Sequence, residues 1–211
     1  MKSKFIDSLL ERENFWYLFA LICLLNMLSI YVIHQIIITD PHYFTGGNAK
    51  ANSLYQNVWV IICIAYPALC FVKVSIITGL LQFGLKNMKI EVPFKQLMSL
   101  AIVGEIVFWI QDLAQMVWFL FIHTGYTMKE VDNFSFLSLQ FFTKPDTNEA
   151  AKTLLNFFSI PELLFWFVLI FGLQLITKVS LKRMAKLVFL TYGLASILYF
   201  LLKSYYLYKI S

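Results

Sequence analysis

Charged side chains are scarce in this chain, because Asp, Glu, Lys and Arg together make up only 14% of its 211 residues. A disordered protein combines low hydrophobicity with high charge, so this scarcity excludes disorder. A soluble domain carries about 25% charged residues, whereas 60% of this chain is hydrophobic, which is more apolar surface than a soluble fold of this length hides from water. The composition therefore indicates an integral membrane protein.

Cysteines and catalytic motifs are also in short supply. The three cysteines fall inside apolar runs, so they indicate no disulfide framework. The sequence has no Walker motif, no Gly-x-Ser-x-Gly, no His-Glu-x-x-His and no Cys-x-x-Cys. We therefore expect a non-catalytic protein without cofactor or metal. The net charge of +5 comes from short basic clusters between apolar runs, so we expect no nucleic-acid partner.

Long apolar runs are what the chain has in abundance. A membrane helix needs about 20 mostly apolar residues. Five segments meet this need, at about 15–38, 58–85, 97–122, 160–179 and 185–207. The runs are too long and too uniformly apolar for barrel strands. The sequence predicts an all-α bundle of five transmembrane helices, in which residues 1–211 form a single membrane domain with long loops at 39–57 and 125–159.

The distribution of Lys and Arg predicts the orientation of this bundle. The N-terminus, the link between spans two and three and the link between spans four and five carry ten basic residues, against six on the opposite side. Basic residues are enriched on the cytoplasmic side of membrane proteins. We therefore expect a cytoplasmic N-terminus, an outer C-terminus and external loops 39–57 and 125–159.

Three charged residues fall in the middle of the predicted spans, away from the span ends: Lys73 in the second and Glu105 and Asp112 in the third. Each costs roughly 2.5–3.5 kcal/mol at the centre of a membrane helix, so such groups face protein or water and pair with one another. The hairpin of these two spans turns near Lys89, which lies 16 residues after Lys73 and 16 residues before Glu105. We therefore predict an ion pair of Lys73 with Glu105, with both side chains turned away from lipid.

In an antiparallel hairpin, residues equally far from the turn lie at the same depth, and we call this the mirror relationship of the two spans. It predicts further members of a polar network. Asp112 shares a helical face with Glu105 and lies opposite Tyr66, while Asn26 in the first span is a third possible partner. Two interpretations stay open. The network either locks the packing of the second and third spans, or serves as a proton or ion relay or a polar groove in a small transporter or channel-like protein that uses Lys73, Glu105 and Asp112.

The second external loop contains an apolar segment, Phe134 to Phe142, that is too short to cross a membrane. We expect it to lie along the outer interface or to cap the bundle, and a helix from Glu149 to follow it, capped by Asn148 or Thr147. An apolar patch with a polar rim is typical of a contact surface. The hypothesis of an extracytoplasmic docking surface names Phe134, Phe136, Leu139, Phe142 and Trp166; the alternative is that these aromatics pack over their own bundle.

Two stretches of the chain resemble the Yip domain family of five-span membrane proteins. One runs from Phe94 through Lys95 and Leu97 to Gly104, and the other runs from Leu154 to Trp166, then through Gly172 to the segment 177–185. The family has five spans and a cytoplasmic N-terminus. The short form of this chain is similar to bacterial members, some of which accompany ABC-type export systems.

This resemblance implies an accessory or scaffold subunit in the cytoplasmic membrane of a bacterium. Its partners would be the lipid bilayer and other membrane proteins, such as an ABC-type export complex. The chain departs from the family pattern after Gly104, where many members have a proline and this chain continues with Glu105.

Overall fold

A computed structural model describes residues 15–38, 49–127, 130–131, 134, 138–142 and 148–210; the side chains of residues 49–57, 141–142, 149 and 210 are not included in that description. These ranges form helices and contain no β-strand beyond an isolated bridge of Ser138 with Ser159. The predicted all-α architecture is therefore confirmed for the described part of the chain.

Five helices in these ranges are long and apolar enough to cross a membrane. They cover Phe15–Ile38, Val58–Asn87, Phe94–Ile122, Ile160–Thr177 and Leu181–Lys209. The first consists of α2 (Phe15–Val32) and a π-helical end, η2 (Ile33–Ile38). The third consists of α4 (Phe94–Val117) and a second π-helical end, η3 (Trp118–Ile122).

Three helices begin earlier than the sequence predicts, that of the third span by three residues, at Phe94. Helix α3 covers Ala49–Asn87, so the second half of the predicted loop 39–57 is helical. The fifth span begins with α8 (Leu181–Val188), continues through a π-helical turn, η5 (Phe189–Gly193), and ends with α9 (Leu194–Ile210). Its first turns carry three basic residues on an exposed face, which lowers their hydropathy and makes the sequence place the start near 185.

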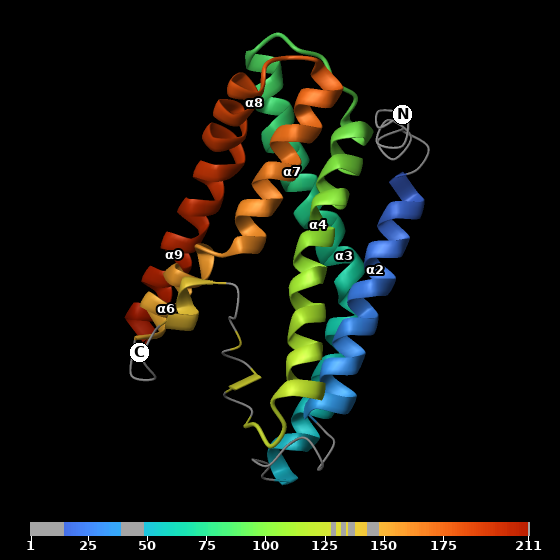
Figure 1. The fold of residues 1–211 in the computed structure, drawn as a ribbon, viewed down its shortest axis with the longest axis vertical. Coiled ribbons are helices and arrows are strands. Elements are labelled where there is room, and N and C mark those ends of the chain that lie inside the picture. Colours follow the sequence, from blue (N-terminus) through green and yellow to red (C-terminus); the bar gives the residue numbers. More distant parts are fainter. Residues whose placement is uncertain are drawn as a thin grey trace.

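Helix α4 lies at the centre of the bundle, between α2 and α7 (Ile160–Thr177) (Figure 1). It packs against α2, α3 and α7, and α7 packs against α8. The main core draws its fully buried side chains from these helices, among them Leu81, Leu97, Phe165, Leu169 and Met184. The fifth span thus completes the bundle on the side of α7 that lies away from α2 (Figure 1).

The two ends of the bundle differ in character. The links 88–93 and 178–180 lie at one end, which we call the basic end, and α6 (Glu149–Phe157) lies at the opposite end, which we call the α6 end (Figure 1). A second, smaller core at the tips of the first and third spans includes Ile37, Phe119 and Tyr126. The Tyr126 hydroxyl donates to the Ile37 carbonyl over 2.8 Å, which ties the segment after the third span to the tip of the first.

Helix α6 is short and packs against α9. Asn148 caps it, with Oδ1 accepting from the Ala150 N–H over 2.8 Å, as the sequence predicts. The Ser204 hydroxyl donates to the Ala150 carbonyl over 2.8 Å, and the rings of Phe157 and Phe200 lie 4.9 Å apart. Helix α6 is therefore fastened to the fifth span.

Candidate functional site

The predicted ion pair forms between α3 and α4. Lys73 Nζ lies 2.8 Å from Glu105 Oε2, so the mirror relationship of the two spans is confirmed. The Lys73 ammonium also lies over the Phe108 ring, 4.3 Å from its centroid, which is a cation–π arrangement. Helix α4 therefore supplies both the anion and the aromatic face that hold the lysine.

The two members of the pair differ in burial. The Glu105 side chain is 5% exposed, whereas the Lys73 side chain is 46% exposed. Glu105 therefore turns into the bundle, as predicted, whereas Lys73 is half-exposed on the surface of α3. Leu69 and Ile76 share a face of α3 with Lys73 and are 62% and 59% exposed.

Glu105 has one oxygen that its partner does not use. Oε1 is fully buried and has no hydrogen-bond partner among the described residues. A buried polar atom without a partner typically costs about 1–3 kcal/mol. The Lys73 ammonium therefore satisfies only half of this carboxylate.

A second carboxyl of the site, Glu162, lies near the start of α7 and escaped the sequence analysis. Its side chain is buried. Trp166 Nε1 donates to Glu162 Oε1 over 2.8 Å, and the Tyr192 hydroxyl donates to the same oxygen over 2.9 Å. Glu162 is also close enough to Lys73 and Glu105 to interact electrostatically with both. The polar cluster thus extends from α3 and α4 to α7 and the fifth span.

Local sequence explains how these groups are placed. Ser159 caps α7 by accepting from the Glu162 N–H over 3.3 Å, and the Ser-x-x-Glu spacing is that of a capping box. The Glu162 carboxyl does not return to the cap; it points to Trp166, one turn along the helix. The π-helical turn η5 carries Tyr192 to this carboxyl from the fifth span.

The four central groups of the cluster share a depth in the bundle. At a rise of about 1.5 Å per residue, Lys73 and Glu162 lie about 21 and 23 Å along their helices from the basic end, and Glu105 and Tyr192 lie about 17 Å along theirs. With the span ends that the sequence predicts, the four depths scatter from about 11 to 26 Å, so only the structure shows that they agree. The signal for Glu162 in the sequence is a carboxyl inside the predicted span 160–179.

Other predicted members of the network are only partly brought together. Tyr66 lies within electrostatic range of Glu105 and Asp112, but no hydrogen bond joins Tyr66 to Asp112 in the described ranges. Asn26 is buried, and its Nδ2 donates to the Ile22 carbonyl of its own helix over 2.9 Å. Asn26 thus bonds to its own helix, and no hydrogen bond joins it to Lys73, Glu105 or Asp112 in the described ranges.

The polar contact of α2 with α4 involves different residues. Trp109 Nε1 donates to Ser29 Oγ over 3.1 Å, and Ser29 Oγ donates to the Leu25 carbonyl over 3.1 Å. Ser29 is one turn away from Asn26 on α2. The hydroxyl of Ser29, and not the more polar amide of Asn26, therefore receives the hydrogen bond from α4.

The candidate docking residues divide between different parts of the molecule. Phe134 packs against Phe119 and Trp118, at ring distances of 5.2 and 6.4 Å, so it covers the tip of its own bundle. Leu139 is 47% exposed, and its N–H donates to the Phe158 carbonyl. Phe136 and the side chain of Phe142 lie outside the described residues.

Trp166 does not lie with this segment. Its indole donates to Glu162 and packs against Phe189 and Tyr192, at ring distances of 6.0 and 6.2 Å. Its assignment to an outer docking surface is therefore corrected to a place between α7 and the fifth span. The sequence does contain a signal for this place: Glu162 and Trp166 are four residues apart, and this spacing puts both side chains on one face of a helix.

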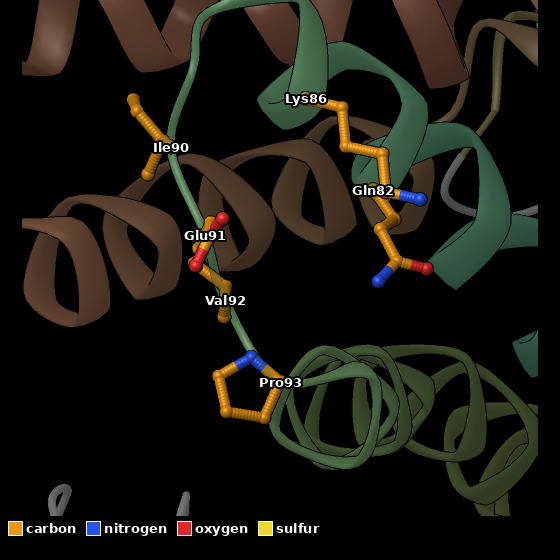
Figure 2. Close-up of a pocket in the computed structure, with 6 residues that line it drawn as sticks. All are labelled: Gln82, Lys86, Ile90, Glu91, Val92 and Pro93. Atoms are coloured by element: carbon orange, nitrogen blue, oxygen red, sulfur yellow. The ribbon is translucent and has the colours of Figure 1, made fainter.

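A depression of about 540 Å³ lies at the basic end, beside the link from α3 to α4 (Figure 2). Gln82 and Lys86 extend from α3, and the other lining residues lie along the link: Ile90, Glu91, Val92 and Pro93. Lys86 and Glu91 form no salt bridge with each other or with any other residue in the part of the chain that the structure describes. Within the same part, no three His, Cys, Asp or Glu side chains gather closely enough to hold a metal ion.

The chain matches no family model, no curated protein and no solved structure. The resemblance to the Yip domain family stays a prediction from short motifs.

Proposed function

We propose that this protein is a non-catalytic accessory or scaffold subunit that binds other membrane proteins, in the manner expected of short bacterial Yip domain proteins. In this proposal its partner is a membrane complex such as an ABC-type exporter, and its location is the cytoplasmic membrane of a bacterium. The motifs at Phe94–Gly104 and Leu154–Trp166 support the family. The main support for a partner-binding role is the exposure of the Lys73 side chain.

Lys73 lies midway along the span Val58–Asn87, with a side chain that is 46% exposed. A charge at this depth is costly in lipid and normally faces protein or a water-filled cavity. Glu105 and Phe108 contact one side of the ammonium. A transmembrane helix of a partner, laid along α3, would cover the other side and remove that cost.

The exposed face of α3 beside Lys73 suits such a helix. Gly79 lies on this face, and a Cβ added there would meet no atom within 4 Å. Small residues allow the backbones of two membrane helices to approach closely. The exposed apolar side chains of Val72, Ile76 and Phe83 surround this glycine along the helix, so we define the docking face by these four residues.

Bulk added at the docking face tests the proposal without disturbing the core. Gly79→Leu should leave the amount of folded protein unchanged, because the position is open, and should abolish contact with the partner. Leu202→Phe is the matched control, since Leu202 is 68% exposed on α9. A photo-crosslinking residue at Ile76 should link to one membrane protein in wild type and not in Gly79→Leu. Equal crosslinking in both would contradict the proposal.

The proposed orientation has a cytoplasmic N-terminus and an outer C-terminus. The support is the charge bias: both basic links, 88–93 and 178–180, lie at the end opposite α6. In intact cells, a membrane-impermeant thiol reagent should label Lys203→Cys and should not label Lys89→Cys, in a background without the three native cysteines. The reverse labelling pattern would show that the orientation is inverted.

A small transporter or relay is the second candidate, and the unpartnered Oε1 of Glu105 favours it. This buried oxygen and the nearby Glu162 carboxyl give a polar path from α3 to the fifth span. If the protein moves protons or ions, proteoliposomes should show flux above empty vesicles, and Glu105→Gln should lower it without loss of folded protein. Flux equal to that of empty vesicles would contradict the relay and would agree with the scaffold proposal.

A further inference from the structure

Two lysines at the basic end adopt a backbone conformation that favours glycine. Lys89 follows α3 with φ of 58°, and Lys178 follows α7 with φ of 57°. In this left-handed region the Cβ of an L-residue crowds the following carbonyl, so helices usually place Gly or Asn here. Among the described residues, these two are the non-glycine residues with positive φ.

Backbone hydrogen bonds hold both lysines in place. Lys89 N–H donates to the Lys86 carbonyl over 2.9 Å, and Ile90 N–H donates to the Leu85 carbonyl over 3.0 Å, which is the Schellman arrangement. Lys178 N–H donates to the Gln174 carbonyl over 2.9 Å. Each lysine is therefore held at the tip of its helix, and its strain is offset by an ordered helix end.

The surroundings of these lysines are strongly basic. Seven exposed basic residues lie at this end: Lys86, Lys89, Lys95, Lys178, Lys182, Arg183 and Lys186. Glu91 is the one acidic residue in the links 88–93 and 178–180 and the helix turns beside them, and none of the seven forms a salt bridge within the described ranges. This surface is therefore complementary to a layer of negative charge.

Neither membrane insertion nor the helix dipole requires the strained positions. The charge bias that orients a membrane protein counts basic residues near the span ends, whatever their backbone conformation. Lys86 already places a cation in the last turn of α3, where it faces the helix dipole. The lysines at positions 89 and 178 thus have a cost that these two effects leave unexplained.

The neighbours of the lysines distinguish a lipid from a soluble anion. Met88 precedes Lys89, Leu181 follows Lys178 by three residues, and both apolar side chains are exposed. The end of α3 packs against α8, because a Cβ at Gly84 would lie 3.1 Å from Leu187 Cγ, so both links belong to one surface. Cations beside exposed apolar side chains match a phospholipid, whose phosphate adjoins its acyl chains.

We propose that Lys89 and Lys178 are the central contacts of a site for anionic phospholipid head groups at the basic end. Anionic lipids attract basic residues next to membrane spans, and the backbone of these two lysines is already held at the helix tips, so binding a head group orders only their side chains. Glu91, which lines the depression beside this link, opposes the binding. The proposal does not depend on the partner-binding function, because it rests on the links at the basic end and on none of the four residues of the docking face.

The test compares thermal unfolding in nanodiscs of phosphatidylcholine alone and of phosphatidylcholine mixed with an equal amount of phosphatidylglycerol. The unfolding midpoint of the wild-type protein should rise in the mixed lipid. The double variant Lys89→Gly with Lys178→Gly should have a higher midpoint than wild type in phosphatidylcholine, because the strain is relieved. The increase of the midpoint from phosphatidylcholine to the mixed lipid should be smaller in this variant than in wild type. If all seven basic residues contributed equally, the increase would shrink by two-sevenths, and we expect it to shrink by more.

Matched variants test whether the rise depends on the charge of these two residues. Lys89→Arg with Lys178→Arg should keep the full rise, and Lys203→Gln with Lys209→Gln, at the α6 end, should also keep it. Glu91→Gln should enlarge it. If the glycine variant does not accumulate, Lys89→Asn with Lys178→Asn replaces it, since Asn tolerates this conformation.

Two results would overturn the proposal. A full lipid-dependent rise in the glycine or asparagine variant would show that the strained lysines do not hold the head groups. An equal rise caused by inorganic phosphate in phosphatidylcholine nanodiscs would show a general anion site in place of a lipid site.

Discussion

Phe165 of α7 lies directly against Gly104 of α4, with no room for a methyl group between them. A Cβ at Gly104 would lie 2.7 Å from Phe165 Cδ2. The Phe165 ring is fully buried and lies 5.3 Å from the ring of Phe108 and 5.2 Å from that of Tyr192. This contact sets the spacing of the two helices that carry Glu105 and Glu162.

Gly104→Ala should therefore destabilise the bundle, by about 1–3 kcal/mol as for other overpacked cores. Gly79→Ala is the matched control, because a Cβ there meets nothing within 4 Å and alanine favours a helix over glycine by about 0.5–1 kcal/mol. Both changes gain the same helix propensity, so the difference of their unfolding midpoints in one detergent isolates the contact with Phe165. Equal midpoints would mean that α4 and α7 separate at little cost.

Either member of the ion pair should leave an unpaired charge behind when its partner is removed. Lys73→Met leaves the carboxylate of Glu105, whose side chain is 5% exposed, and Glu105→Gln leaves the ammonium of Lys73 midway along its span. Removing one partner of a buried pair typically costs about 3–5 kcal/mol, so each single variant should cost more than the double variant. The double variant should recover much of the loss, as a double-mutant cycle in detergent would measure. A double variant whose loss equals the sum of the two single losses would show that the pair is uncoupled.

The two donors to Glu162 Oε1 give a second stability test. Tyr192→Phe and Trp166→Phe each remove one hydrogen bond, of 2.9 and 2.8 Å, and each should cost about 1–3 kcal/mol. Tyr206→Phe serves as control because Tyr206 is exposed on α9. Glu162→Gln keeps an acceptor oxygen and should cost less than Glu162→Leu. Unchanged unfolding midpoints in the Phe variants would contradict a packing role for this cluster.

Outside the spans, Glu130 closes a turn whose stability should depend on pH. Its carboxylate accepts from the Thr127 N–H over 2.6 Å and from the Thr127 hydroxyl over 2.9 Å, and His123 Nε2 lies 3.4 Å away. These hydrogen bonds, the backbone one above all, hold the pKa of Glu130 below its ordinary value. Because the pKa is lower in the folded turn, its stabilisation is complete above the unfolded pKa and is lost as pH falls through the folded pKa.

NMR titration of the Glu130 side-chain carbon should therefore give a midpoint below about 4.3, the value of an unperturbed glutamate. Hydrogen exchange at the Thr127 amide should become faster, relative to its intrinsic rate, over the same pH range. Glu130→Gln should remove this dependence on acid. A titration midpoint at or above the ordinary value would show that the turn does not hold the carboxylate.

The sequence by itself determined the spans and one tertiary contact. The predicted segments 15–38 and 160–179 agree closely with the helices Phe15–Ile38 and Ile160–Thr177, because hydropathy is a property of each residue and adds along the chain. The ion pair of Lys73 and Glu105 followed from the short link at residues 88–93, since a short link makes two antiparallel helices mirror each other in depth.

Contacts of helices that are distant in the chain were decided only by the tertiary structure. Tyr192 reaches Glu162 across 30 residues of sequence, and no periodicity connects the two. Asn26 bonds to its own helix while Ser29 meets Trp109. Lys73 lies on an exposed edge although its partner is buried. The physical reason is that α2, α3, α4 and α7 are apolar on nearly every side, so hydropathy does not mark the face that turns inward, and side-chain packing alone selects it.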